Sequence, residues 1–407
     1  MRIAYYTHET ISSGLFRTQV KDVVAALSSQ GNGNKYTIYV YNYFWTLVQN
    51  FALLRSLKKE LSSLGIDLRF FPILVPVKYS LVSHSYFRFL KIFFQLMAFF
   101  TFDRKADVHH CRGYLLTYAL VKNNLSPVIF DMRSLWVLEN ISAGNLKPET
   151  NLTRAWFELE KTCISLSSFS VGVSAAMGDY VSKISAEVKF KLIPISVVAN
   201  DFQFDTDMRE KIRTANAWQE SLVMVYSGSL GLSRINFKAL QSFFKVLKRE
   251  IPDLKGIVIS EDSKKLFVEL FEEANFLEDD YLVTSAKEAS LTGILSAADF
   301  GVHALPRQLD YETRLGTKVV EYLMNGLPVI VNKNVGDAAK LIEEKNLGYV
   351  LDHMSDTDFY VIKKMGINWR FYAGQASADF ARGTFASEII VKMYSSLYVA
   401  INASSRD

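Results

Sequence analysis

Two runs of alternating strand and helix patterns constrain the fold of this chain more than any other feature. In the first run, short apolar segments lie at residues 2–8, 36–43, 66–75, 106–111, 127–133 and 170–174, with amphipathic segments between them. In the second run, apolar segments lie at residues 222–228, 255–260, 280–286, 298–305, 328–332 and 348–351. Repeated strand–helix alternation is typical of parallel, doubly wound sheets. The sequence therefore predicts an α/β protein with two Rossmann-like domains that face a cleft.

The boundaries of these domains follow from two further segments. Residues 200–220 are polar and lack strand character, so they are expected to form a linker. Near the C-terminus, apolar residues recur every four positions and predict one face of a helix: Phe385, Ile389, Met393, Leu397 and Ile401. We therefore expect domains at residues 1–200 and 201–380, followed by a C-terminal helix at residues 381–407.

Composition excludes several classes of protein. A net charge of +4 over 407 residues does not favour a nucleic-acid binder driven by global charge. The two cysteines, Cys111 and Cys163, cannot make a disulfide framework, which predicts a reduced, cytoplasmic protein. The N-terminus enters a strand directly, so no signal peptide is expected. No stretch has the uncharged apolar length of a membrane-spanning helix.

Residues 87–102, FRFLKIFFQLMAFFTF, form the most apolar segment and leave two interpretations open. The segment contains Arg88, Lys91 and Gln95 among many phenylalanines. Such a helix can lie in a membrane interface, which would make the protein peripheral at the inner face of a membrane. Alternatively, it can pack on a sheet inside the first domain.

The segment RLGTKVVEYLMNGLPVIV, residues 314–331, describes a tight turn, a short helix and a buried strand. Gly316 and Thr317 open the helix, with Thr317 as a plausible N-cap, and Gly326 ends it. A helix start beside a strand end is a favourable place for an anion. Lys318 can bind phosphate there, and Glu321 can accept two sugar hydroxyls. A glutamate in a first helical turn is also favourable against the helix dipole without any ligand.

This segment resembles the nucleotide-binding helix of GT-B glycosyltransferases of the family-4-like group (glycosyltransferase group 1), which often show TK-x-x-EYL-x-x-GLPVI. The resemblance implies that the second domain binds a nucleotide-diphosphate sugar and the first binds the acceptor. It also implies a C-terminal helix that crosses back to brace the first domain. Retention of anomeric configuration and no required metal are implied as well, with the nucleotide sugar acting as donor substrate and no separate cofactor.

On the donor side, the resemblance extends to the segment VYSGSLGLSRIN. Gly228, Ser229 and Gly231 can form a backbone N–H concavity for a diphosphate. Many relatives place Arg directly after the first Gly, where this chain has Ser229, and only Arg234 lies near their Lys position. Either Arg307 or Lys318 could supply the missing cation. Relatives also carry a Glu where this chain has Thr313. The donor-side residues are therefore expected to be Gly228, Ser229, Arg234, Arg307, Thr317, Lys318 and Glu321.

On the acceptor side, Gly14 follows the first strand in a loop that GT-B enzymes direct toward the cleft. The loop is not a GxGxxG motif, so a dinucleotide enzyme is poorly supported. The segment ADVHHCRG resembles the GT-B pattern D-x-x-H-x-R-G and places Arg112 at a strand end. Arg112 is thus expected to hold acceptor or sugar hydroxyls, and Arg112 and Lys318 are the expected catalytic residues.

The run His109, His110, Cys111 suggests a metal cluster at first sight. Neighbours on a strand point to opposite faces, so three consecutive residues cannot ligate one ion, and no metal site is expected. His110 is expected to be a packed, hydrogen-bonded histidine. A further group at the end of another strand either shapes the acceptor site or forms a salt-bridged loop: Asp131, Arg133, Trp136 and Glu139.

The sequence thus predicts a glycosyltransferase that moves a sugar from a nucleotide-diphosphate sugar to a glycan or lipid-linked acceptor, in surface polysaccharide synthesis. Two alternatives stay open. One is a sugar-nucleotide epimerase with the same two-domain build. The other is a non-catalytic partner subunit, which the departures at Ser229 and Thr313 favour. No nucleic-acid partner is expected.

Overall fold

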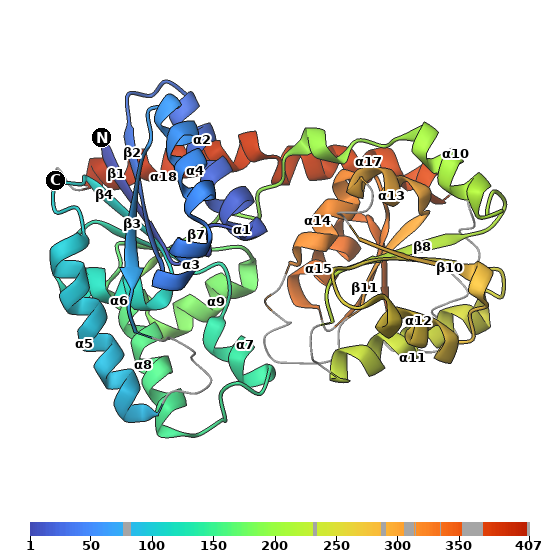
Figure 1. The fold of residues 1–407 in the computed structure, drawn as a ribbon, viewed down its shortest axis with the longest axis horizontal. Helices are drawn as coiled ribbons and strands as arrows, with labels where there is room; N and C mark the ends of the chain where they lie inside the picture. Colours follow the sequence, from blue (N-terminus) through green and yellow to red (C-terminus); the bar gives the residue numbers. More distant parts are fainter. Residues whose placement is uncertain are drawn as a thin grey trace. The chain divides into compact units, whose positions relative to one another are not determined.

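The computed structural model describes residues 1–75, 83–230, 234–285, 290–304, 313, 315–333, 335–351 and 369–404. The chain divides into two compact units: unit 1 is Met1–Ser196 with Ser387–Asp407, and unit 2 is Val197–Ala386. Each unit is an α/β structure built on its own parallel sheet (Figure 1). The predicted fold class is confirmed.

The sheet of unit 1 has the strand order β3-β2-β1-β4-β5-β6-β7 within the described residues. Its strands are β1 Arg2–Thr7, β2 Lys35–Tyr43, β3 Asp67–Ile73, β4 Val108–Arg112, β5 Val128–Asp131, β6 Phe169–Gly172 and β7 Lys189–Leu192. The direction in which strands are added changes between β1 and β4, as in Rossmann folds. Ligands of such sheets bind in the crevice at the carboxyl ends of the strands on either side of this point. The sequence did not predict β7, because this edge strand reads Lys-Phe-Lys-Leu and buries none of its residues.

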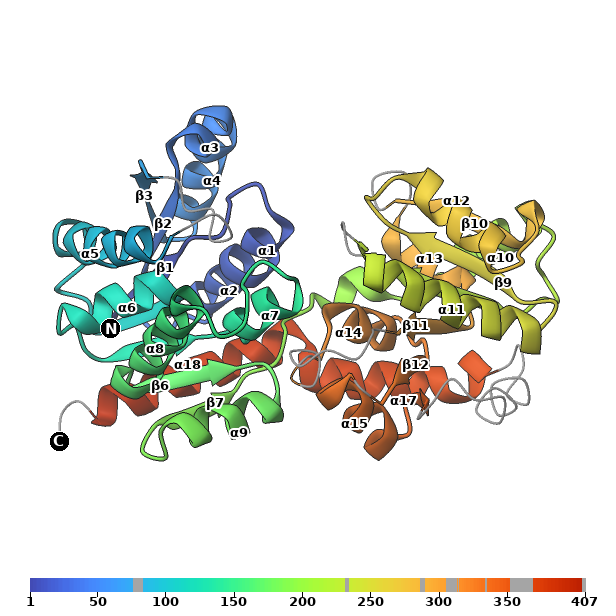
Figure 2. The same ribbon diagram turned by 90° about the horizontal axis from the view of Figure 1, so that it is seen from below.

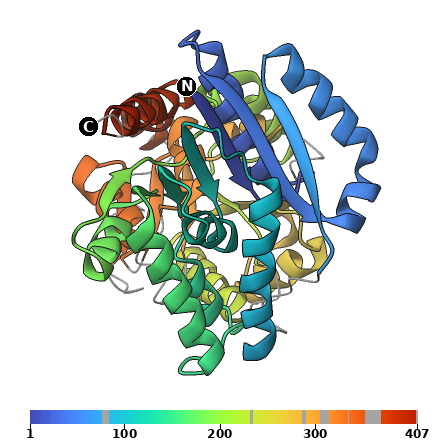
Figure 3. The same ribbon diagram turned by 90° about the vertical axis from the view of Figure 1, so that its left-hand side faces the viewer.

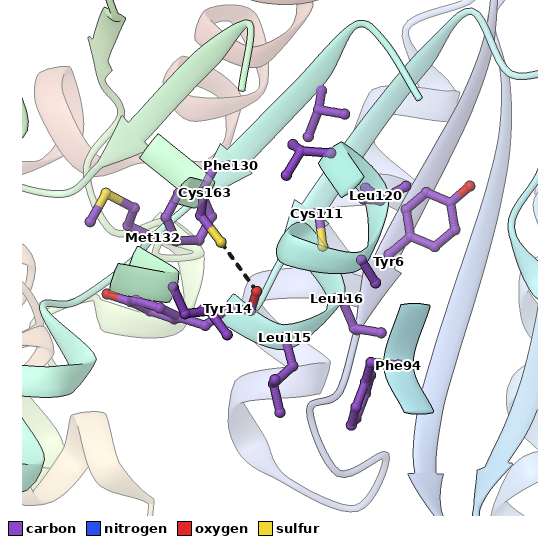
Figure 4. Packing of buried hydrophobic residues seen from close by; sticks show 14 of the residues in the cluster. Tyr6, Phe94, Cys111, Tyr114, Leu115, Leu116, Leu120, Phe130, Met132 and Cys163 are labelled. Atoms are coloured by element: carbon purple, nitrogen blue, oxygen red, sulfur yellow. Dashed lines mark hydrogen bonds between the residues drawn. The ribbon is translucent and has the colours of Figure 1, made fainter. Parts of the chain in front are cut away.

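Helices cover both faces of this sheet (Figure 3). They are α1 Gly14–Phe16, η1 Arg17–Lys21, α2 Asp22–Ser29, α3 Phe44–Gln49, α4 Phe51–Ser63, α5 His84–Thr101, α6 Tyr114–Lys122, α7 Trp136–Ser142, α8 Asn151–Leu166, α9 Ala175–Ile184 and α18 Ser387–Ser404. On one face, α2, α4 and α18 share a buried apolar cluster with the strands. On the other face, α5, α6, α8 and α9 share a second cluster. Figure 4 shows part of that second cluster, where Cys111 and Cys163 lie as buried, separate thiols among aromatic and leucine side chains.

The C-terminal segment forms two helices, where the sequence predicted one. The helix α17, Trp369–Phe385, belongs to unit 2, and α18 begins at Ser387 in unit 1. The buried face of α18 includes Tyr394, Leu397, Tyr398 and Ile401. A four-residue spacing drifts away from the 3.6-residue helical repeat, so Ile389 and Met393 are only half-buried.

The sheet of unit 2 has the order β10-β9-β8-β11-β12-β13 within the described residues. Its strands are β8 Val223–Ser227, β9 Lys255–Ile259, β10 Tyr281–Thr284, β11 Phe300–His303, β12 Val329–Asn332 and β13 Gly348–Leu351. Its helices are η3 Ala199–Phe202, α10 Thr206–Ala215, α11 Arg234–Glu250, α12 Lys264–Glu273, η4 Glu278–Asp280, α13 Leu291–Ala297, α14 Thr317–Met324, α15 Gly336–Lys345 and α17. Figure 1 shows α11 and α12 on one side of the strands and α13 and α14 on the other.

Residues 200–220 are not a linker, and that prediction was wrong. They contain η3 and α10, and α10 packs against α13 through two buried arginines. Arg209 and Arg213 donate to the two carboxylate oxygens of Asp299, at 2.6 and 2.5 Å. The segment looked like a linker because its inward-facing residues are charged, but those charges are paired inside unit 2.

Candidate functional site

The strongest candidate site in unit 2 lies at the carboxyl ends of β8 and β11, where α14 begins. The buried hydroxyl of Tyr322 accepts a hydrogen bond from the Ser227 amide at 2.6 Å and donates to the Val302 carbonyl at 3.4 Å. A Cβ at Gly301 would collide with the Tyr322 ring, so glycine lets α14 pack closely on β11. Tyr322 therefore fixes α14 to the ends of both central strands.

The turn into α14 requires a glycine. Gly316 is the N-cap, with φ of 76°, and a Cβ there would lie 2.7 Å from Nε2 of His303. The prediction that Thr317 is the N-cap was wrong. The N-cap residue has a positive φ, which favours glycine, so Gly316 is the N-cap and exposed Thr317 is the first residue of the helix. Because Gly316 has no side chain, the N-cap residue itself makes no side-chain bond to the helix. Its first backbone N–H groups are thus suited to an anionic ligand.

Lys318 and Glu321 lie side by side on the first turn of α14. The Lys318 ammonium donates to Oε2 of Glu321 at 2.8 Å. The Glu321 side chain is 12% exposed, and that of Lys318 is 34% exposed. A diphosphate could draw Lys318 away from this pair, leaving the Glu321 carboxylate to accept hydroxyl donors.

The loop after β8 binds a carboxylate that belongs to the chain itself. Asp262, which follows β9, accepts from the Ser229 hydroxyl at 2.7 and 2.9 Å and from the Leu230 amide at 2.7 Å. The Gly228 amide donates to the Ile259 carbonyl at 3.0 Å. The sequence reasoning missed Asp262. The negative charge of Asp262 lies against the loop that was expected to face a diphosphate. The start of α14 and Lys318 are therefore better placed than this loop to contact phosphate.

Two of the predicted donor-side residues, Arg307 and Arg234, and the loop residue Gly231 cannot be placed completely. Arg307 and Gly231 lie outside the described residues. Arg234 is the first residue of α11, and its side chain is outside the described part of the structure.

In unit 1, Gly14 begins α1 at the carboxyl end of β1. Ser13 caps this helix by accepting from the Phe16 amide at 3.1 Å. Gly14 is exposed, and a Cβ there would meet no atom within 4 Å. Packing within the described structure therefore does not demand glycine at this position.

Arg112 ends β4 with a side chain that faces inward. The residue is 7% exposed, and its Nε donates to Glu9 at 3.2 Å. Gly113, with φ of 135°, follows it, and a Cβ there would collide with the His8 ring. The carboxyl ends of β1 and β4 thus bring together Arg112, Glu9 and His8. The sequence reasoning did not identify the last two.

A cavity of about 190 Å³ lies beside this group. His8, Thr10 and Asn42 are among its polar lining, and Ile73, Phe94, Leu115 and Leu116 among its apolar lining. Unit 1 therefore offers a recess with both polar and apolar walls at the carboxyl edge of its sheet.

The histidines of β4 point to opposite faces of the sheet, as predicted. His109 approaches the Tyr6 hydroxyl on one face. On the other face, His110 Nδ1 lies 2.7 Å from the Tyr398 hydroxyl and its Nε2 lies 3.3 Å from Asp131. The prediction of a packed, hydrogen-bonded His110 is confirmed. Within the described residues, no group of three or more His, Cys, Asp or Glu side chains is arranged to hold a metal ion.

Asp131 belongs to a buried network and not to an open surface. Burial alone would raise the pKa of Asp131, but Arg133, His110 and Arg112 lower it to about 2. Arg133 lies 3.6 Å from Asp131 and donates to the Tyr394 hydroxyl of α18 at 3.2 Å. The segment was expected either to shape the acceptor site or to form a salt-bridged loop. The contacts of Asp131 and Arg133 agree with the salt-bridged loop.

Comparison with known proteins identifies the fold. No protein-family model matches the chain, and no curated protein matches its sequence. A sucrose-phosphate synthase from Thermosynechococcus elongatus has a TM-score of 0.71 at 14% identity, covering 99% of this chain and 100% of that chain. HepE from Anabaena, solved with UDP, has a TM-score of 0.67 at 15% identity, covering 98% and 100%. WaaG, a glycosyltransferase involved in lipopolysaccharide biosynthesis, has a TM-score of 0.62 at 12% identity, covering 98% and 99%. The chain therefore has the GT-B fold of these glycosyltransferases.

Proposed function

We propose that this protein is a glycosyltransferase that uses a nucleotide-diphosphate sugar as donor and a glycan or lipid-linked molecule as acceptor. The observation that carries the proposal is the start of α14 at the carboxyl edge of a GT-B sheet, with Lys318 and Glu321 adjacent on its first turn. HepE has been solved with UDP and with UDP-glucose, which supports a uridine nucleotide.

The proposed roles follow from charge and position. Glu321 accepts the ribose hydroxyls, and Lys318 and the first backbone N–H groups of α14 bind the diphosphate. The family resemblance adds Arg234 and Arg307 as further cations for the diphosphate. Fixed donors of this kind stabilise a leaving diphosphate without requiring a metal ion. In unit 1, Arg112 and Gly14 contribute to the acceptor side. Retention of configuration and a role in cytoplasmic steps of surface polysaccharide synthesis rest on resemblance to the family-4-like group.

A non-catalytic nucleotide-sugar-binding subunit is the second candidate. It is favoured by one observation, the bonds from Ser229 and Leu230 to Asp262 in the loop where relatives place a cation. A catalytic protein transfers labelled sugar to a lipid-linked acceptor, whereas a non-catalytic subunit binds the nucleotide without transfer. Epimerised donor in the absence of acceptor would instead indicate an epimerase.

The direct experiment is a thermal-shift panel followed by a transfer assay. UDP or GDP is expected to raise the melting temperature, whereas NAD is not. Stabilisation by NAD alone would contradict the proposal. In the transfer assay, EDTA is expected to leave most of the activity intact.

We also propose a peripheral membrane contact through α5. Within the described residues, no helix is long and apolar enough to cross a membrane. One face of α5 packs on the sheet, but the opposite face exposes five large apolar side chains: Phe89, Ile92, Leu96, Phe99 and Phe100. Arg88 and Lys91 lie along one flank of this stripe.

This contact predicts salt-sensitive flotation with anionic vesicles. Each basic residue near such a surface contributes about 1 kcal/mol, and salt screens the contribution. Changing Arg88 and Lys91 to Glu is expected to reduce flotation. A wild-type protein that stays in the soluble fraction with anionic lipid at low salt would contradict this proposal.

A further inference from the structure

A second apolar surface of unit 1 lies on the other side of edge strand β3 from α5. Figure 2 shows the helices α3 and α4 that form it. We call the recess between these helices and β3 the α3–α4 groove. It has a volume of about 430 Å³, and its lining includes Phe44, Val48, Phe51, Arg55 and Lys58 of the two helices and Pro72 of β3. Most of the lining residues that belong to α3 and α4 are exposed. No other described element therefore covers the groove.

The sequence of α3 and α4 gives them two apolar faces. Leu57 and Leu61 are buried against the sheet. The helix α3 buries none of its residues. Phe44 and Val48, four residues apart on α3, line the groove together with Phe51 at the start of α4. The core explains the first face. The second face has no partner among the described residues and indicates a binding surface.

The aromatic residues at the rim are unusually exposed. Trp45 is 71% exposed, Phe51 57% and Phe44 44%. Trp45 contacts the Phe44 ring at a centroid distance of 5.4 Å, so the two rings extend one apolar surface. An exposed tryptophan beside an apolar groove is well suited to the headgroup level of a membrane.

Positive charge accompanies this apolar surface. Arg55 and Lys58 line the groove, and the Arg55 guanidinium lies 4.9 Å from the Phe51 ring centroid. Two acidic residues of α4 and β3 are engaged with other cations: Glu60 accepts from Lys21 at 2.7 Å, and Asp67 from Arg69 at 2.8 Å. The occupant should therefore combine an apolar chain with a negative headgroup.

The edge strand argues against a peptide as the occupant. A peptide that added to β3 would need the strand's outward backbone donors. Pro72 has no N–H to offer a partner strand, and proline is common where proteins protect an edge strand.

We propose that the α3–α4 groove docks on an anionic lipid bilayer, with an acyl chain in the groove and the lipid phosphate against Arg55 and Lys58. Trp45 then lies at the interface. This inference concerns a surface separate from α5 and does not depend on glycosyl transfer.

Trp45 provides a direct readout in the intact protein. Trp156, Trp218 and Trp369 are buried and Trp136 is half-buried, so Trp45 is the most exposed of the five tryptophans. Vesicles of phosphatidylcholine with phosphatidylglycerol should shift its emission to shorter wavelength, whereas pure phosphatidylcholine should not. W45F should lose the shift but still float with the anionic vesicles.

The charge requirement is tested with a matched pair of variants. R55E/K58E is expected to weaken binding to the anionic vesicles at least tenfold, with an unchanged melting temperature. K340E/K345E changes two exposed lysines of α15 in unit 2 and is expected to bind like wild type. R88E/K91E reports the α5 contact separately, and the Trp45 shift should survive in it at saturating lipid.

Three results would overturn the inference. The first is Trp45 emission that does not respond to anionic vesicles. The second is equal binding by R55E/K58E and wild type. The third is a concentration-dependent emission shift without lipid, accompanied by dimerisation in sedimentation, which would assign the groove to a second copy of the chain.

Discussion

Glu321 can either bind a ligand or only stabilise the helix through its ion pair, and the two roles predict different effects of mutation. Its ion pair with Lys318 is partly exposed and contributes at most about 1 kcal/mol to stability. A carboxylate that holds ribose hydroxyls contributes more, on the order of 1.5–3 kcal/mol to binding. We therefore expect E321Q to weaken nucleotide binding at least tenfold while the melting temperature changes little.

E343Q, at an exposed glutamate of α15, is the matched control and should bind as wild type does. Equal affinities in E321Q and E343Q would assign Glu321 to helix stability alone.

Asp299 is expected to be among the most sensitive residues for the stability of unit 2. Its two carboxylate oxygens accept from Arg209 and Arg213, and all three residues are buried. D299N leaves two buried guanidinium groups without their counter-charge, which typically costs about 3–5 kcal/mol. Urea unfolding should show this loss, whereas D253N, at an exposed aspartate, should stay within about 0.5 kcal/mol of wild type.

His109 makes the stability of unit 1 sensitive to acid. Burial lowers the pKa of His109 from 6.5 to about 4, so the folded state holds it neutral. Its contribution is fully present above pH 6.5 and is lost as the pH falls toward 4, because the unfolded chain binds the proton first. Between pH 7.5 and 5 the expected loss is about 2 kcal/mol from this group.

His110 acts in the same direction, since burial lowers its pKa as well. H109N is expected to flatten the pH dependence of the unfolding free energy over this range. An identical slope in H109N and wild type would show that His109 is not responsible.

At the scale of elements, α14 depends on the glycine that starts it. Gly316 has a positive φ and lies against His303. G316A should therefore cost about 1–3 kcal/mol in backbone strain, displace the first turn of α14 and weaken nucleotide binding. G383A, in α17, adds a Cβ that meets no atom within 4 Å and should be neutral or stabilising by up to about 1 kcal/mol. Similar losses in both variants would rule out a special role for the turn.

The elements that sequence predicted well are those whose pattern is set by burial. The central strands of both sheets are apolar because both faces are covered, and Gly326, with φ of 73°, ends α14 where the sequence placed its end. The sequence failed where charge replaces apolar packing. Arg209 and Arg213 made α10 look like a linker, and the exposed residues of β7 concealed a strand.

The candidate site was only partly visible for a related reason. Lys318 and Glu321 are neighbours on one helix, so their spacing alone predicts that they meet. Asp262 and His303 come from other segments, and only the folded sheet brings them to the loop after β8 and to Gly316. No local pattern marks such residues, because their partners are distant in sequence.

At the scale of the whole molecule, each unit has its own sheet and core, and α18 ties the C-terminus of the chain to unit 1. His110 and Asp131 on the central strands contact Tyr398 and Tyr394 of α18. In both sheets the candidate residues lie at the carboxyl ends of parallel strands, which is the usual ligand side of doubly wound sheets. This arrangement is the basis for assigning nucleotide binding to unit 2.

Calorimetric titration of the full chain with UDP and GDP tests the central claim most directly. We expect saturable one-to-one binding of at least one of them, at least tenfold weaker in E321Q and unchanged in E343Q. At one hundred times its dissociation constant, that nucleotide should stabilise the fold by about 2.7 kcal/mol. Absence of binding by both nucleotides, or binding that E321Q leaves unaffected, would contradict the assignment of the α14 start as the donor site.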